Sequence, residues 1–283
     1  MKGRILIYTI LSAFFFASCE EEIDVDFPAA EPVVTVEGYV EPGEIPYVIL
    51  TKSLGFFAAI DSTTFQGAAI NGADVFISDG KDTVKMFQPE PTFPFYLAPT
   101  MAVAEGKTYT LFSTIEGQKV SASTTILEKI AVDSFYAEEE VITEEDTFYR
   151  LFVKFSEPNP VGNKYRYFTR RPSDQFFDTE QNSVFDDNFI NGTTLDLPLN
   201  GSEWPDSTDF RTFGTFREGD TVILKWSHMS FEHFKFWQTY ETQVNNLGNP
   251  FAPVTVVDFN VDGGIGIWGD YNSFYDTVIV KKQ

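Results

Sequence analysis

A run of alternating oxygen-bearing side chains near the C-terminus has the pattern of a cation-binding loop. Asp258, Asn260 and Asp262 occupy every second position and are followed by Gly263. Carboxylate and amide oxygens at this spacing, ahead of a glycine, can wrap around one Ca²⁺. The position at which a bidentate glutamate would complete the loop is Gly269, and no good helix precedes the run. These three residues are therefore a candidate calcium site, and a polar turn into a glycine-rich strand is the alternative. No other cofactor is expected.

The two histidines do not have the spacing of a zinc protease. His228 and His233 are five positions apart, whereas His-Glu-x-x-His places two imidazoles one helical turn apart. We expect an ordinary pair at the start of a helix. The sequence contains no Gly-x-Ser-x-Gly motif for a nucleophilic serine. These patterns predict a protein that is not an enzyme, although 42 acidic residues leave room for a hydrolase with a nonstandard carboxylate site.

The single cysteine, Cys19, follows a segment with the features of a secretory signal. Lys2 and Arg4 precede an apolar run over 5–17, and small residues stand just before the cysteine. The run is shorter than the roughly 20 residues that a spanning helix needs. Small residues before such a cysteine are typical of bacterial lipoproteins, whose first mature residue is acylated. We predict a signal peptide over 1–18 and a lipid on Cys19 that anchors the protein. The alternative is an ordinary secretory signal with an incidental cysteine.

The chain is strongly acidic, with a formal net charge of −22. A field of this sign repels nucleic acid, so no nucleic-acid partner is expected. Three glutamates directly follow Cys19, and residues 19–32 are predicted to form an acidic tether. Acidic residues behind an acylated cysteine are typical of lipoproteins exported to the cell surface. We therefore predict attachment to the outer membrane, facing the cell exterior, with a merely solvated tether as the simpler interpretation.

The remaining chain reads as short strands separated by turns. β-Branched and alternating stretches occur over 33–40, 47–52, 73–78, 83–87, 106–111 and 119–126, and Asp79-Gly80 predicts a hairpin turn. This spacing predicts an immunoglobulin-like β-sandwich over 33–127.

A second β-rich domain is predicted over 128–283, with one helix near 230–245 that Ser230 can cap. Its expected strands cover 148–155, 165–171, 220–227 and 275–281. Residues 172–215 read as loops, and the acidic segment from Glu138 to Asp146 reads as an exposed loop. The glycines of 263–269 are expected to permit a tight bend or close backbone packing. The fold class is thus mainly β.

Aromatic residues are abundant, with 30 Phe, 12 Tyr and 4 Trp, and most must belong to the core. Trp204 lies in a polar loop and is the best candidate for an exposed ring. Arg170 and Arg171 are candidates for a ligand or partner contact, or for pairing with carboxylates such as Asp186 and Asp187. We expect a glycan or peptide ligand, or a receptor, to contact the loops of 174–209.

Several Asp-Ser and Asp-Thr pairs match the sites at which Bacteroidota attach O-linked glycans to exported proteins. Ser62 and Ser207 are the predicted acceptors. The alternative is a turn that leads into a strand.

Several sequence segments, in their order along the chain, together match a known pattern. They are Glu20 to Asp26 after the lipoprotein start, Val36 to Val40, Tyr165 to Arg171, Ile190 to Gly192, Gly248 to Phe251 and Gly263 to Gly269. This order resembles the Bacteroidota lipoproteins catalogued as domain of unknown function 4249, over nearly the whole chain. The resemblance implies an outer-membrane lipoprotein that is often encoded beside a TonB-dependent receptor. It implies no established activity and no catalytic residues.

We therefore expect a non-enzymatic lipoprotein that assists a TonB-dependent receptor in nutrient capture or uptake. A structural or assembly lipoprotein of the envelope without a ligand is the second hypothesis, and the carboxylate hydrolase is the third.

Overall fold

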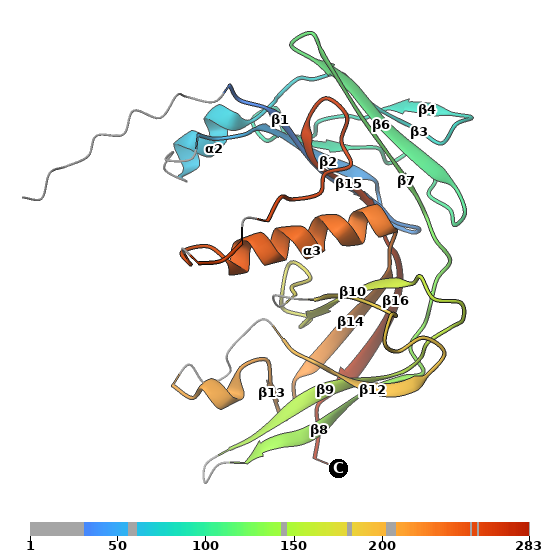
Figure 1. The fold of residues 1–283 in the computed structure, drawn as a ribbon, viewed down its shortest axis with the longest axis vertical. Helices are drawn as coiled ribbons and strands as arrows, with labels where there is room; N and C mark the ends of the chain where they lie inside the picture. Colours follow the sequence, from blue (N-terminus) through green and yellow to red (C-terminus); the bar gives the residue numbers. More distant parts are fainter. Residues whose placement is uncertain are drawn as a thin grey trace, which may run out of the picture. The chain divides into compact units, whose positions relative to one another are not determined.

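Alternating apolar and polar residues form the strands that make up most of the regular secondary structure (Figure 1). In β1 (Val34–Val40) the buried Val34 and Val36 alternate with Thr35 and the exposed Glu37. Successive side chains of a strand point to opposite faces, so one face of β1 enters a core and the other points outward. The structure, a computed structural model, describes residues 31–55, 61–142, 146–179, 183–201, 208–249, 251–253 and 255–282.

Two facing sheets form the first sandwich. The first has the strand order β15 (Ile265–Asp270), β1, β2 (Tyr47–Lys52), β5 (Phe95–Leu97). The second has the order β4 (Thr83–Lys85), β3 (Val75–Ser78), β6 (Thr108–Ile115), β7 (Gln118–Thr125). The core between them includes Val36, Leu50, Ile77, Leu111 and Trp268.

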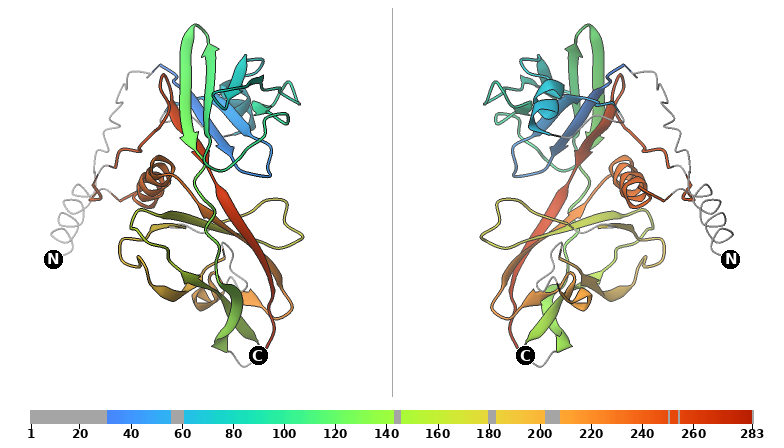
Figure 2. Two further views of the ribbon diagram at one scale, coloured as in Figure 1. Left: turned by 90° about the vertical axis from the view of Figure 1, so that its right-hand side faces the viewer. Right: turned by 90° about the vertical axis from the view of Figure 1, so that its left-hand side faces the viewer.

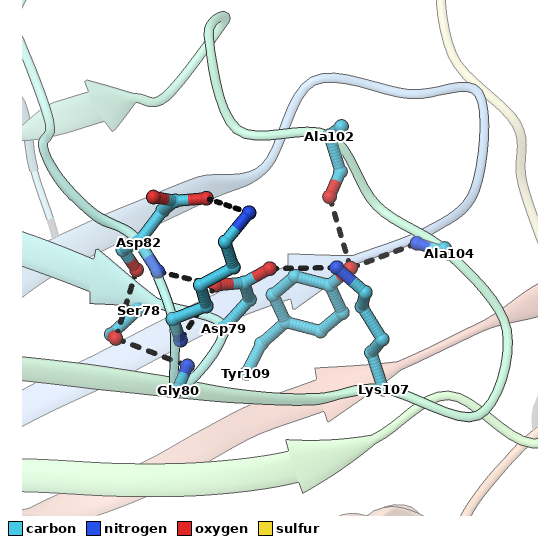
Figure 3. A network of polar contacts seen from close by, with 9 residues as sticks. Ser78, Asp79, Gly80, Asp82, Ala102, Ala104, Lys107 and Tyr109 are labelled. Atoms are coloured by element: carbon cyan, nitrogen blue, oxygen red, sulfur yellow. Dashed lines mark hydrogen bonds and ion pairs between the residues drawn. The ribbon is translucent and has the colours of Figure 1, made fainter.

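The turn between β3 and β4 is the one that the sequence predicted, and Asp79 organises it (Figure 3). Asp79 Oδ1 accepts hydrogen bonds from the backbone N–H groups of Lys81 and Asp82, and Oδ2 accepts one from Lys107 Nζ at 2.7 Å. These donors favour the carboxylate, the Asp82 N–H most of all, and hold the pKa of Asp79 well below its usual range. The turn is thereby attached to the start of β6.

A second pair of sheets forms the second sandwich. One has the order β11 (Val184–Asp186), β10 (Lys164–Arg170), β14 (Thr221–His228), β16 (Asn272–Ile279). In the other, β9 (Thr147–Ser156) pairs with β8 (Ser134–Ile142), β12 (Thr194–Leu199) and β13 (Phe216–Arg217). Their shared core includes Leu151, Phe155, Tyr165, Leu224 and Trp226.

Three local predictions from the sequence were wrong. Residues 172–215, predicted to be loops, include β11 and the six-residue strand β12, which pairs along β9. Glu138 to Glu140 do not belong to a loop but to β8, which pairs along β9, and the guanidinium of Arg150 on β9 binds the carboxylate of Glu140. A second helix, α2 (Ser62–Ala68), interrupts the strands of the first sandwich. Asp61 caps it by accepting bonds from the N–H groups of Thr63 and Thr64. All of these elements depend on strand pairing or helix capping, which the spacing of apolar residues does not show.

The last two strands connect the sandwiches. Only Tyr271 separates β15 from β16, and Figure 2 shows them as one nearly continuous strand that runs from one sandwich into the other. β15 pairs in parallel with β1, whereas β16 pairs antiparallel with β14. The predicted boundary near residue 128 therefore does not account for β15, which completes the first sheet although it follows the second sandwich in the chain. Residues 32–283 form one compact unit.

The helix α3 (Phe231–Asn245) lies between the two sandwiches, against β15, β10 and β11 (Figure 1). Its buried Phe234 and Phe236 join Tyr39, Ile267 and Tyr271 in a third apolar cluster. Ser230 occupies the N-cap position as predicted, but its hydroxyl donates to Asp270 and does not cap the helix. In the described part of the chain, no helix has the length and apolar character needed to cross a membrane.

The fold class is confirmed: the chain is mainly β, and an N-terminal sandwich precedes a β-rich region that carries the long helix.

Candidate functional site

Two strands present charged side chains on either side of an aromatic ring along their outward faces. These residues are Glu37, Tyr39 and Glu41 on β1 and just after it, and Arg166, Phe168 and Arg170 on β10. Because side chains at every second position of a strand share a face, each set forms one surface while its neighbours enter the cores. Both surfaces line a single cleft of about 720 Å³. That volume lies in the range of about 300–1,000 Å³ usual for ligand sites.

An ion pair joins the two walls of this cleft. Lys225 Nζ on β14 lies 2.5 Å from Glu41 Oε2 at the end of β1, and both side chains are largely buried. The Tyr275 hydroxyl donates to the other carboxylate oxygen of Glu41 at 3.0 Å. Lys225 Nζ also lies 4.9 Å from the ring centre of Tyr271. These contacts link the end of β1 to β14 and β16, and Glu41 neutralises the charge of the Lys225 ammonium group.

Arg166 is a buried and firmly held cation, only 5% exposed. Its guanidinium carbon lies 3.6 Å from the ring centre of Trp237 on α3. Nε donates to Ser183 Oγ at 3.1 Å, and Nη1 donates to the Tyr271 hydroxyl at 3.2 Å. Nη2 lies 3.7 Å from Glu241 Oε1. A planar cation stacked on an aromatic face and held by several partners is a fixed part of the cleft wall.

His233 positions Trp237 through a hydrogen bond between their rings. Trp237 Nε1 donates to His233 Nε2 at 3.0 Å, and His233 Nδ1 lies 2.8 Å from the backbone oxygen of Asp270. Since indole nitrogen is only a donor, Nε2 must accept and Nδ1 must carry the proton. Burial lowers the pKa of His233 to about 3, so this neutral tautomer persists.

Aromatic rings form a continuous lining between the charged groups. The ring centres of Tyr39 and Tyr47 are 5.6 Å apart, those of Tyr47 and Phe95 are 5.3 Å apart, and those of Tyr39 and Tyr271 are 5.4 Å apart. Burial raises the pKa of Tyr271 to about 12 and raises the pKa of Tyr39, Tyr47 and Tyr275 above their usual value. The phenols therefore stay protonated and keep both a ring face and a hydroxyl group.

A second chamber of about 510 Å³ adjoins the cleft and shares Arg170, Gln175, Phe176 and Phe177 with it. The Arg170 guanidinium lies 4.8 Å from the ring centre of Phe177, and Nη1 donates to the Asp174 backbone oxygen at 3.4 Å. Within the described part of the chain, the buried Nε of Arg170 has no hydrogen-bond partner. Phe176 is 74% exposed. Arg170 thus places a guanidinium group at the junction of two cavities.

Comparison with known proteins identifies the family. The family model described as a domain of unknown function, DUF4249, matches residues 20–274. The chain belongs to this family. No curated protein matches it. Membership in the DUF4249 family carries no activity, so the function must be inferred from the geometry of the cleft.

The predicted contact residues fall at the cleft only in part. Arg170 lines both chambers of this DUF4249 protein, and Arg171 lines the second. Asp186 and Asp187 are not the partners of these arginines: Arg171 lies 3.5 Å from Asp220, and Asp187 accepts from the N–H groups of the 162–163 turn. The predicted loop region contributes residues 174–178 and Gly201 to the lining. Cys19, Trp204 and Ser207 lie outside the described residues.

The candidate calcium residues take a structural role at the start of β15. Asn260 Oδ1 accepts from the backbone N–H of Trp268 at 2.9 Å, and Nδ2 donates to the Trp268 backbone oxygen at 2.8 Å. The oxygen that a cation would need is therefore engaged, while Asp258 and Asp262 are exposed. Among the described residues, no group of three or more His, Cys, Asp and Glu side chains is arranged to hold a metal ion. Asn260 thus ties this segment to β15, and whether the segment binds Ca²⁺ stays a prediction.

The predicted glycan acceptor Ser62 is exposed but begins α2 and does not lie in a loop. Whether it carries a glycan stays a prediction.

The sequence reasoning missed most of the cleft. A usable signal existed, because Glu-x-Tyr-x-Glu at β1 and Arg-x-Phe-x-Arg in β10 each place two like charges around a ring on one face. Nothing in either strand alone indicates that these two faces meet.

Proposed function

We propose that this DUF4249 protein is a non-enzymatic binding protein that captures a small ligand in the cleft between its sandwiches. The observation that supports this proposal is the convergence of aromatic rings, neutral phenols and firmly held charges in one cavity. Such a cavity, largely apolar with a few fixed polar groups, is the usual form of a ligand site. Rigid side chains lose little conformational entropy when a ligand binds.

The arrangement favours binding over hydrolysis. Burial raises the pKa of Asp270 to about 6, which is the property that a carboxylate acid catalyst would need. However, Asp270 accepts hydrogen bonds from Thr124 Oγ1 at 2.7 Å and from Ser230, and it does not line the cleft. Its raised pKa thus belongs to a structural network at the start of α3.

The cellular setting of the proposal comes from the sequence. The basic and apolar leader, the small residues before Cys19 and the acidic tether support a Bacteroidota lipoprotein anchored in the outer membrane through that cysteine. An outward-facing protein of this kind would deliver its ligand to a TonB-dependent receptor. In this scheme the cleft supplies capture and the receptor supplies transport.

Purification of the lipidated protein from its own outer membrane in mild detergent tests the proposal. We expect a TonB-dependent receptor in stoichiometric amount, together with a small molecule that mass spectrometry detects after the protein is unfolded. Phe176→Ala should reduce the amount of this small molecule several-fold, because it removes an exposed ring from the cleft wall.

Phe189→Ala is the matched control, since Phe189 is 98% exposed and does not line the cleft. It should leave both the receptor and the small molecule in place. Recovery of the protein without receptor, or equal cargo in both variants, would contradict the proposal.

A further inference from the structure

We infer that the cleft accepts a short extended peptide with free charged ends, its ammonium group at Glu37 and its carboxylate at Arg170. This inference rests on the proposed function, because it names the chemical class of ligand for the same site.

Contacts order the cleft from Glu37 at one end to Arg170 at the other, and the exposed Glu44 also belongs to its lining. Tyr39, two positions from Glu37, stacks on Tyr271, whose hydroxyl accepts from Arg166. Glu41, two positions further along the chain, binds Lys225.

Lys225 is the partner of Phe168 in the β10–β14 register, and Arg170 lies two positions beyond Phe168 on β10. Glu37 and Arg170 therefore occupy opposite ends. The segment from Glu37 to Glu41 alone spans about 13 Å at ~3.3 Å per residue, so a ligand that reaches both ends is an extended chain of about four residues or more.

The charges in the middle of the cleft are already paired. Lys225 is neutralised by Glu41 at 2.5 Å, and Arg166 lies 3.7 Å from Glu241. A ligand crossing this region meets rings and phenols with little net charge. Apolar or aromatic side chains of a peptide can pack there.

Among the described residues, Glu37 and Arg170 form no ion pair, unlike Lys225 and Arg166 in the middle of the cleft. Glu37 is exposed and accepts a hydrogen bond from the Tyr39 hydroxyl at 3.3 Å. A carboxylate beside the ring faces of Tyr39 and Tyr47 is a favourable place for an ammonium group.

At the other end, Arg170 lines both chambers, and its Nη1 makes only a long hydrogen bond, 3.4 Å, to the backbone oxygen of Asp174. The fork of donors on a guanidinium matches the two oxygens of a carboxylate.

The same features count against a neutral glycan. Sugar rings could stack on the aromatic lining, but they would cover Glu37 and Arg170 without an opposite charge for either. Burying a charge without a partner costs free energy. A zwitterionic peptide satisfies both ends at once.

The test uses the full lipidated chain in detergent and three libraries: tetra- to hexapeptides with free termini, the same peptides acetylated and amidated, and neutral oligosaccharides. Bound molecules are identified by mass spectrometry, and the best peptide is titrated by calorimetry with each terminus blocked in turn. We expect retention of the free peptides. Blocking either end should weaken binding about tenfold or more, as expected for loss of a charge-assisted hydrogen bond at each terminus.

Two substitutions assign each end. Glu37→Gln should abolish the preference for a free amino terminus over an acetylated one, and Arg170→Gln should abolish the preference for a free carboxylate over an amide. Glu116→Gln and Arg211→Gln are matched controls, because both residues are exposed and neither lines the cleft. Both controls should keep both preferences.

The outcomes separate this inference from the proposed function. Equal retention of free and blocked peptides, or retention of oligosaccharides alone with loss in Phe176→Ala, would overturn the peptide assignment and leave the binding function intact. If no library binds and the protein purified from its membrane carries no small molecule, both fail.

Discussion

Trp237 owes its position over Arg166 to His233, a residue that does not line the cleft itself. The imidazole accepts from Trp237 Nε1 and donates to the Asp270 backbone oxygen, so both of its nitrogens are used. Protonation would remove the acceptor and place a charge in an apolar cluster. The neutral ring is thus a condition for the geometry of the site.

We expect the His233 ring not to titrate between pH 7.5 and 5, because burial lowers its pKa to about 3 from an ordinary value near 6.5. The ring proton shifts in NMR spectra measure this directly. Below about pH 6.5 the unfolded chain takes up a proton that the folded chain refuses. Acidification toward pH 3 therefore lowers the free energy of unfolding through this residue.

Asp270 changes the stability of the fold with pH in the direction opposite to His233. Its folded pKa is raised to about 6, so between its unfolded value near 4 and pH 6 the folded chain binds more protons and gains stability on acidification. Asp270→Asn should therefore steepen the loss of stability from pH 6 to 4 in denaturant titrations.

The His228→Gln variant has His233 as its one remaining histidine, so it identifies the His233 signal in the NMR spectrum. A His233 ring that titrates near pH 6.5 in the folded protein would contradict its burial.

At the scale of elements, β15 depends on glycine where it meets β1. Gly266 has a φ of 112°, and a Cβ atom there would lie 1.9 Å from the backbone oxygen of Val36. Gly38 on β1 is similarly restricted, since its Cβ would lie 2.9 Å from the Trp268 ring. The close backbone packing expected for the glycine-rich segment is confirmed here.

Gly266→Ala should destabilise the protein by about 3 kcal/mol or more, because it combines backbone strain with a steric clash at the β1–β15 pair. The free energy of unfolding from urea titration measures the loss.

Gly67→Ala is the control, because Gly67 lies in α2 and an alanine Cβ at this position would have no neighbouring atom within 4 Å. In a helix, alanine is favoured over glycine by up to about 1 kcal/mol, so this variant should be neutral or slightly more stable. An equal loss in the free energy of unfolding in Gly266→Ala and Gly67→Ala would mean that β15 does not need its close backbone approach to β1.

The elements also show which local signals were sufficient. Asp79-Gly80 and the alternating runs on either side identified β3 and β4, and the apolar spacing after Ser230 identified α3. Strand β8 was missed because its run of charged residues reads as a loop and its order comes from pairing with β9. The helix α2 was missed because its capping residues, Asp61 and Thr64, also suit a turn.

For the molecule as a whole, the proposed attachment to the outer membrane depends on one atom, the Cys19 sulfur. Cys19→Ala should move the protein from the membrane fraction to the soluble fraction, because without acyl chains only the folded domains remain. Cell fractionation and immunoblotting measure this. Ser18→Ala keeps a small residue before the cysteine and should stay in the membrane fraction. A Cys19→Ala protein that still sediments with the membrane would contradict the lipid anchor.

The whole molecule also explains why the site could not be derived from single segments. Glu41 and Lys225 belong to segments far apart in the chain, and they meet because β15 pairs with β1 while β16 pairs with β14. The near-continuous strand thereby brings the two outward faces together. Arg170 was recognised as a candidate, whereas Arg166 and Trp237 were not, since their roles arise only when α3 packs beside β10.

Local patterns were enough to establish many of the strands, the long helix, the acidic character and the family resemblance of this chain. These properties depend on side-chain alternation, turn residues and composition, all of which neighbouring residues report. The cleft required the folded arrangement, because alternation shows which side chains share a face but not which other face they meet. That choice follows from long-range strand pairing and core packing, and it places Glu37 and Arg170 at the two ends of one cavity.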